Sequence, residues 1–153
     1  MQKEKHYINS IYYQFELTAK YCKYLGSQLF NKLKCALSLD EVVTLDTLAF
    51  YGEMCQRDLA KLILKDRPST GRILNSLEQK GYIERIAGTK NNRLIRKIIL
   101  TDDGKTILSE ITSKLKEYMG KIPQIFSEEK IAETKKMMSD FREVLKQEVE
   151  LNI

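Results

Sequence analysis

The chain has 153 residues, and its 26 Lys and Arg against 21 Asp and Glu give a formal net charge of +5 at pH 7. This length is enough for one compact domain, or for a small domain with added dimerisation helices. No apolar run approaches the roughly 18 residues that would cross a membrane. Residues 1–6 do not lead into the apolar stretch of a signal peptide, so we expect a cytoplasmic protein without membrane contact.

The residues that catalysis or metal binding would need are scarce. Three cysteines, Cys22, Cys35 and Cys55, form no C-x-x-C pair, and their odd number argues against a disulfide framework. With His6 as the one histidine, no Cys/His zinc site of ordinary spacing can be written. The sequence also has no G-x-S-x-G elbow and no Gly-rich phosphate loop. We therefore expect that the protein is not an enzyme and that it binds no cofactor and no metal ion.

A long amphipathic helix is predicted over residues 7–34. Its apolar residues recur at steps of three and four, which places them on one helix face. They are Ile8, Ile11, Phe15, Cys22, Leu25, Leu29 and Leu33. A second helix follows, with Ser38 or Asp40 as its N-cap and Gly52 as its end.

Residues 56–81 predict a helix-turn-helix. A short helix over 56–64 is followed by a turn over 65–68 and by a second helix over 69–80, which Gly81 ends. The apolar positions of the second helix lie along one side, so we expect them to pack on the first helix. The rest of the second helix is a polar arc.

A basic β-hairpin is predicted directly after the second helix. Its strands, over 82–87 and 94–100, flank a polar tip over 88–93. A hairpin in this position is the wing of a winged helix-turn-helix, which would span residues 38–104. We expect a mainly α fold with a small β-hairpin wing, flanked by N- and C-terminal dimerisation helices.

The positive charge of the chain is concentrated in this region. Residues 56–105 hold twelve Lys and Arg against six Asp and Glu, whereas the other residues hold 14 against 15. A protein that binds nucleic acid neutralises phosphates with clustered cations. The excess therefore points to nucleic acid, although basic residues on solvated helix faces are common.

The polar arc and the wing tip carry side chains suited to DNA. Arg72 has the fork that pairs with guanine, and the amides of Asn75 and Gln79 match adenine. Hydroxyl groups at the helix N-terminus suit phosphate oxygens. We expect double-stranded DNA to contact Arg67, Ser69, Thr70, Arg72, Asn75, Ser76, Gln79, Lys90 and Arg93. The plainer interpretation is an ordinary polar helix face and a soluble hairpin turn.

Two amphipathic helices are predicted in the last third of the chain. The first begins at Thr101 as its N-cap and is broken by Pro123, and the second begins at Ser127 and repeats apolar residues at near-heptad spacing. Segments 7–35 and 105–150 present more apolar surface than a small winged core covers. We therefore expect them to be the dimerisation helices of a homodimer.

Three motifs resemble the MarR family of bacterial winged helix-turn-helix transcriptional regulators. They are QRDLA at 56–60, STGRILNSLEQKGYIER at 69–85 and LTDDG at 100–104. The resemblance covers almost all of residues 1–153, and it implies a homodimeric repressor on a palindromic operator, released by a small ligand or an oxidant. The wing tip departs from the family's Asp-x-Arg, because Asn91-Asn92-Arg93-Leu94 has no acid.

The resemblance also places an effector site between the dimerisation helices and the winged domain. Tyr12, Tyr13 and Tyr24 suit a small aromatic effector that buries its ring and keeps its polar edge hydrogen-bonded. Cys22 lies among them and resembles the cysteine of the family's peroxide-sensing branch. Its alternative use is to fill a helix interface, as for the other two cysteines.

Two further functions fit the same sequence. The basic region suits a protein that binds nucleic acid without sequence specificity, and the terminal helices suit a dimerisation or adaptor module whose wing binds protein. A steep salt dependence and a large preference for one duplex over random DNA would distinguish a specific regulator from both.

Overall fold

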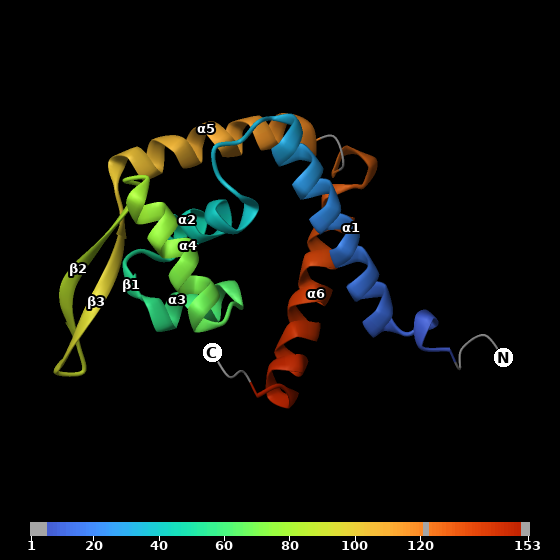
Figure 1. Ribbon diagram of the computed structural model, residues 1–153. Helices are drawn as coiled ribbons and strands as arrows, with labels where there is room; N and C mark the ends of the chain where they lie inside the picture. The colour runs from blue at the N-terminus through green and yellow to red at the C-terminus, as the bar shows by residue number, and fades with distance from the viewer. Residues whose placement is uncertain (1–5, 121–122, 151–153) are drawn as a thin grey trace. The chain divides into compact units, whose positions relative to one another are not determined.

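The computed structural model describes residues 6–120 and 123–150 (Figure 1). The chain forms two compact units, one ending at Leu39 and the other beginning at Asp40. It is mainly helical with one small antiparallel sheet, which confirms the fold class predicted from the sequence.

The first unit contains a 3-10 turn, η2 (Tyr7–Asn9), and the long helix α1 (Ile11–Lys32). The predicted helix begins four residues too early, because Ser10 has extended backbone angles and its side chain accepts a hydrogen bond from the Tyr13 N–H at 3.2 Å. This is an ordinary serine N-cap, and it fixes the start of the helix.

The second unit is built around helix α2 (Leu39–Tyr51), which ends as predicted at Gly52 with a φ of +83°. Its core is a set of apolar side chains from helices and strands with at most 7% of their surface exposed. They are Val42, Leu45, Leu48, Leu59, Ala60, Leu74, Leu77, Ile83, Ile98, Leu108 and Ile111. At about 25 cal/mol per Å² of apolar surface, this burial is the main stabilising term of the unit.

The helix-turn-helix consists of α3 (Gln56–Ile63) and α4 (Arg67–Gln79). Leu64 ends α3 in the left-handed region with a φ of +51°. Helix α4 begins two residues earlier than predicted, because Asp66 is its N-cap and Pro68 lies in its first turn. Leu62, an apolar residue of α3, is 46% exposed.

The sheet has three antiparallel strands in the order β1-β3-β2, formed by β1 (Met54–Cys55), β2 (Ile83–Lys90) and β3 (Arg93–Leu100). The hairpin of β2 and β3 extends away from the helices (Figure 1). Its tip is the two-residue turn Asn91-Asn92, both with positive φ, and not the six residues predicted. Two left-handed residues match the twist of a hairpin, and asparagine tolerates that geometry.

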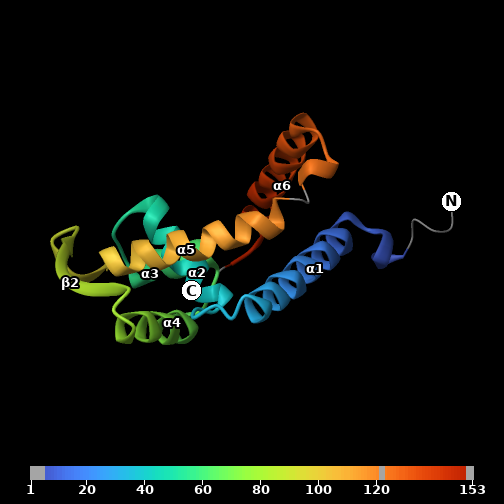
Figure 2. The ribbon, with the colours of Figure 1, turned by 90° about the horizontal axis from the view of Figure 1, so that it is seen from above.

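The remaining elements are α5 (Asp102–Met119), the 3-10 turn η3 (Pro123–Ile125) and α6 (Glu128–Glu148). Thr101 and Ser127 cap the two helices as predicted, accepting from the N–H groups three residues ahead. Helix α5 ends at Met119, before the predicted limit at Pro123. It lies above α2 in Figure 1, and it passes over α2 in the view from above (Figure 2).

The first turn of α5 requires a glycine at position 104. A Cβ at this position would lie 2.2 Å from the carbonyl oxygen of Tyr82, which is backbone and cannot give way. The glycine therefore lets the start of α5 approach the start of the hairpin closely.

Candidate nucleic-acid interface

A network of polar side chains fixes the beginning of α4. The carboxylate of Asp66 accepts from the Ser69 N–H at 2.7 Å and from the Ser69 hydroxyl at 2.9 Å. Arg72 donates from Nη2 to the Ser69 hydroxyl at 2.9 Å. The backbone N–H of Ser69, and then its hydroxyl, lower the pKa of the Asp66 carboxyl. The guanidinium of Arg72 is thereby held beside the first turn of the helix.

Two of the predicted DNA-contacting hydroxyls on α4 face the protein. Thr70 is fully buried, and its hydroxyl donates to the Asp66 carbonyl at 2.9 Å. Ser76 is half-buried and donates to Glu41 Oε1 on α2 at 2.6 Å. Because both hydroxyls donate hydrogen bonds within the protein, both are left out of the interface developed below.

The opposite face of α4 is open to solvent. Leu74 and Leu77 have no exposed surface on the inner side of the helix. The exposed side chains of the outer face include a cation and two amides, which are groups that hydrogen-bond to base edges in a major groove. They are Arg72, Asn75 and Gln79, with Arg67 exposed at the helix start.

An arginine from the wing reaches this face of α4. Arg85 of β2 donates to Asn75 Oδ1 at 2.9 Å and to Glu78 Oε2 at 2.6 Å, and its side chain is only 16% exposed. A cavity of about 270 Å³ lies between α4 and the sheet here. Its lining residues are Gln56, Gly71, Asn75, Arg85, Arg96 and Ile98.

Arg85 and Arg96 were missed by the sequence analysis. The charge pattern predicts a basic hairpin, but it points to DNA contacts only at the tip, from Lys90 and Arg93. Strand alternation was the available clue, because residues two apart share one face of a strand and cross-strand partners share it too. Arg85 pairs with Ile98 in the register, two residues beyond Arg96.

The two predicted cations of the wing tip, Lys90 and Arg93, differ in their surroundings. Arg93 is exposed beside the turn. The ammonium of Lys90 forms a salt bridge with the carboxylate of Asp58 on α3. This hydrogen bond lowers the pKa of Asp58 and raises the pKa of Lys90. The charge of Lys90 is therefore partly neutralised within the protein.

The residues predicted for effector or redox sensing lie on α1. Tyr12, Cys22 and Tyr24 are exposed, whereas Tyr13 is half-buried and its ring packs edge-on against Tyr7 with centroids 5.8 Å apart. Lys20, a neighbour of Cys22 in the sequence, is hydrogen-bonded to Glu16, which raises the pKa of the lysine. The effector site and the redox role both stay predictions.

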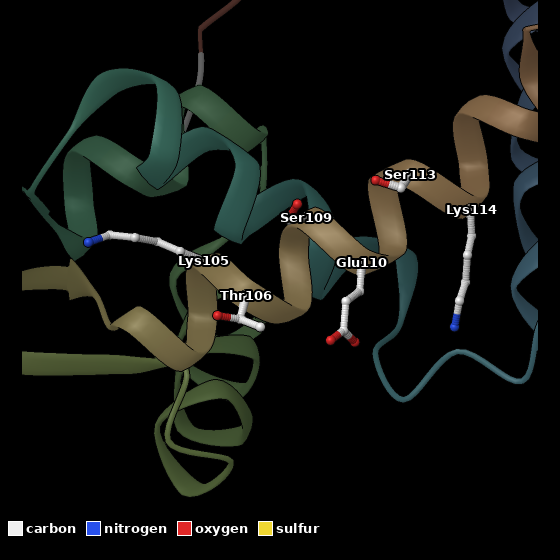
Figure 3. Close-up of a pocket in the computed structure, with 6 residues that line it drawn as sticks. All are labelled: Lys105, Thr106, Ser109, Glu110, Ser113 and Lys114. Atoms are coloured by element: carbon white, nitrogen blue, oxygen red, sulfur yellow. The ribbon is translucent and has the colours of Figure 1, made fainter.

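A second depression lies along α5. It is lined by Lys105, Thr106, Ser109, Glu110, Ser113 and Lys114, and Figure 3 shows Glu110 and Lys114 extending on the same side of the helix. All six lining residues have polar or charged side chains, and none is aromatic. Among residues 6–120 and 123–150, no cluster of His, Cys, Asp and Glu could hold a metal ion, and no helix is long and apolar enough to cross a membrane.

Helix α3, the turn, helix α4 and the β2–β3 hairpin together define a winged helix-turn-helix. Residues 37–95 match the model of the MarR family. This segment of the chain is a MarR-family domain, which confirms the resemblance seen in the sequence.

Solved structures extend the likeness over most of the chain. The structure of NadR with 4-hydroxyphenylacetate has 23% identity and a TM-score of 0.74, over 90% of this chain and 94% of NadR. The complex of S. aureus MepR with DNA has 22% identity and a TM-score of 0.72, over 92% and 99%. YusO from Bacillus subtilis has 22% identity and a TM-score of 0.57, over 85% and 92%. These likenesses show the fold, and no curated protein matches this chain.

Proposed function

We propose that this chain is a sequence-specific DNA-binding transcription regulator that acts as a homodimer. One observation carries the proposal: α4 buries one face in the core and presents Arg72, Asn75 and Gln79 to solvent on the other. A helix inserted in a major groove needs this division, because its inner face must be fixed while its outer face meets base edges. The solved complex of MepR with DNA supports the same use of the fold.

The wing supplies the contacts that do not depend on sequence. Arg93 at the tip is exposed and can reach phosphates or the minor groove, where narrow A·T-rich stretches attract arginine. Arg96 lies nearer the base of the hairpin, beside α4. With twelve Lys and Arg against six Asp and Glu over 56–105, phosphate neutralisation would provide much of the affinity.

A second copy of the chain is proposed to cover the C-terminal helix. No residue of α6 is buried, although Ile131, Met138, Phe141 and Leu145 form a half-buried stripe and Val144 is 59% exposed. A helix with such a stripe gains stability when a partner removes it from water. Two α4 helices about one DNA turn apart, roughly 34–36 Å, would then read a palindromic operator.

We infer that the regulator is a repressor released by a small aromatic acid. NadR is bound to 4-hydroxyphenylacetate in its solved structure, and Tyr12, Tyr13 and Tyr24 offer aromatic surface on α1. A ligand releases DNA only if it binds the DNA-incompetent arrangement better, by a coupling of about 1–3 kcal/mol. Oxidation of the exposed Cys22 is the alternative trigger.

The DNA-binding proposal is tested by selecting duplexes from a random pool with the full-length protein. A specific regulator should bind the selected duplex at least about 10³-fold more tightly than random DNA, and the affinity should fall steeply with salt. Equal affinity for all duplexes would indicate a non-specific nucleic-acid binder. Binding to no duplex would favour the adaptor function.

The trigger is tested on the selected duplex with two kinds of compound. We expect 4-hydroxyphenylacetate or salicylate at millimolar concentrations to weaken DNA binding equally in the wild type and in Cys22→Ser. Organic peroxide is the second arm of the experiment. A peroxide response that is lost in Cys22→Ser, with no effect of the aromatic acids, would make the protein a redox sensor.

A further inference from the structure

A hydrogen bond that the sequence does not predict links Asn75 and Arg85. Asn75 lies on the exposed face of α4, and Arg85 reaches it from strand β2. The Arg85 guanidinium is shared between Asn75 Oδ1 at 2.9 Å and Glu78 Oε2 at 2.6 Å. Asn75 and Glu78 are three residues apart, so they are neighbours on one helix face and a single planar fork can serve both.

The chemistry of arginine determines how the Asn75 amide must be oriented. A guanidinium has five N–H donors and no acceptor, so only the amide oxygen can face it. Turning the amide over would set its NH₂ group against another donor and lose the hydrogen bond. A charged donor makes this bond roughly twice as strong as a neutral one, which favours the observed orientation.

The surroundings of Arg85 hold the guanidinium in place. Its side chain is 16% exposed and lines the cavity next to Ile98, its partner across the sheet, which is 1% exposed. Glu78 fixes the other end of the fork. Because little water competes at this position, the arginine is an ordered support for Asn75 and not a mobile surface cation.

We propose that Arg85 is a positioning residue that fixes Asn75 with its NH₂ group outward, so that α4 reads a base edge offering a hydrogen-bond acceptor. The acceptors available in the major groove are purine N7, guanine O6 and thymine O4, whereas cytosine N4 presents a donor. This inference rests on the proposed function, because it assumes that α4 enters the groove. Arg85, a residue of the wing, would thus determine the preference at one base position through Asn75, without touching the base itself.

The test compares base preferences at single positions of the selected duplex. Asn75→Ala first identifies the base pair whose preference depends on Asn75. Arg85→Met, which removes every donor, should reduce the preference at that same base pair by about tenfold, whereas Arg85→Lys, a donor without acceptor, should restore most of it. Arg96→Met is the matched control, since Arg96 lines the same cavity, and it should weaken binding equally on all sequences.

A second variant keeps the proposal testable if Arg85→Met does not fold. Asn75→Asp retains an oxygen for Arg85 but has no donor, so the preference at the identified base pair should turn towards a base that offers a donor, cytosine N4 or adenine N6. An unchanged preference in Asn75→Asp, or an equal loss on all sequences in Arg85→Met, would overturn this proposal alone. Selection of no duplex by the wild type would overturn the proposed function and this inference with it.

Discussion

The hydroxyl of Ser76 on α4 donates to Glu41 Oε1 on α2 at 2.6 Å. The same oxygen accepts from Lys80 Nζ at 2.7 Å, and Glu41 is only 6% exposed. Ser76 of α4 and Lys80, the C-cap residue of that helix, thus converge on one buried carboxylate. This arrangement sets the position of α4 against α2, and it uses the Ser76 hydroxyl inside the protein.

Ser76→Ala should therefore affect stability more than DNA binding. We expect its free energy of unfolding to fall by about 0.5–1.5 kcal/mol, the usual worth of one hydrogen bond, while affinity for the selected duplex stays within a factor of about three. Urea unfolding and fluorescence anisotropy measure the two quantities. A loss of affinity at unchanged stability would return Ser76 to the DNA interface.

Arg72→Ala should reduce affinity for the selected duplex by about 1–3 kcal/mol and relax the preference at one base position, because Arg72 is held at the exposed start of α4. Lys136→Ala is the control, since Lys136 is a 77% exposed cation of α6. It should change affinity little. If Arg72→Ala weakened random and selected duplexes equally, Arg72 would be a phosphate contact.

The two cations of the wing tip should behave differently. Arg93→Ala should weaken binding to all sequences and reduce the slope of log affinity against log salt by about one. Lys90→Ala should have a smaller effect, because Asp58 already neutralises part of the lysine's charge. An unchanged slope in Arg93→Ala would remove the wing from the interface.

The Asp66 cap predicts a pH dependence of stability. Its pKa is lowered in the native state, so the cap stabilises the fold above the unfolded pKa of about 3.9 and is lost as pH falls through the native pKa. Asp66→Asn keeps the acceptor oxygen but does not titrate. The stability advantage of the wild type over Asp66→Asn should therefore shrink below about pH 4. A difference that is independent of pH would contradict this role of the charge.

Deletion of residues 127–153 should disrupt the homodimer while leaving the proposed DNA-contacting residues in place. We expect the shortened chain to be monomeric in analytical ultracentrifugation and to lose tight binding to the selected duplex, although no proposed DNA contact is removed. The half-buried apolar stripe of α6, which a second copy would cover further, is the physical reason. A monomer that bound the full duplex with wild-type affinity would disprove the proposed homodimeric assembly.

Local signals in the sequence predicted several of the helix boundaries. Gly52, Thr101 and Ser127 act as the terminators and caps that were expected, because capping is a property of a few adjacent residues. The hairpin tip was predicted too long because its turn type depends on the φ of two residues, Asn91 and Asn92. Strand β1 was not predicted, because two residues are too short to show a period.

The candidate interface was only partly predictable. The sequence alone does not tell whether a polar side chain on a helix faces solvent or hydrogen-bonds within the protein. Thr70 and Ser76 look like surface hydroxyls in the sequence, yet one is buried and the other faces Glu41. Arg85 and Glu78 are seven residues apart, and their contact exists only because the hairpin folds back on α4. Such relationships depend on tertiary structure and not on local pattern.

The central claim is that α4 contacts DNA through its exposed face, and photo-cross-linking tests it most directly. A photoactivatable residue is placed at Gln79 of α4 or, as the control, at Lys136 of α6, in the full-length protein bound to its selected duplex. We predict an efficient cross-link to bases from position 79 and none from position 136. A cross-link from position 136 with none from position 79 would contradict the account.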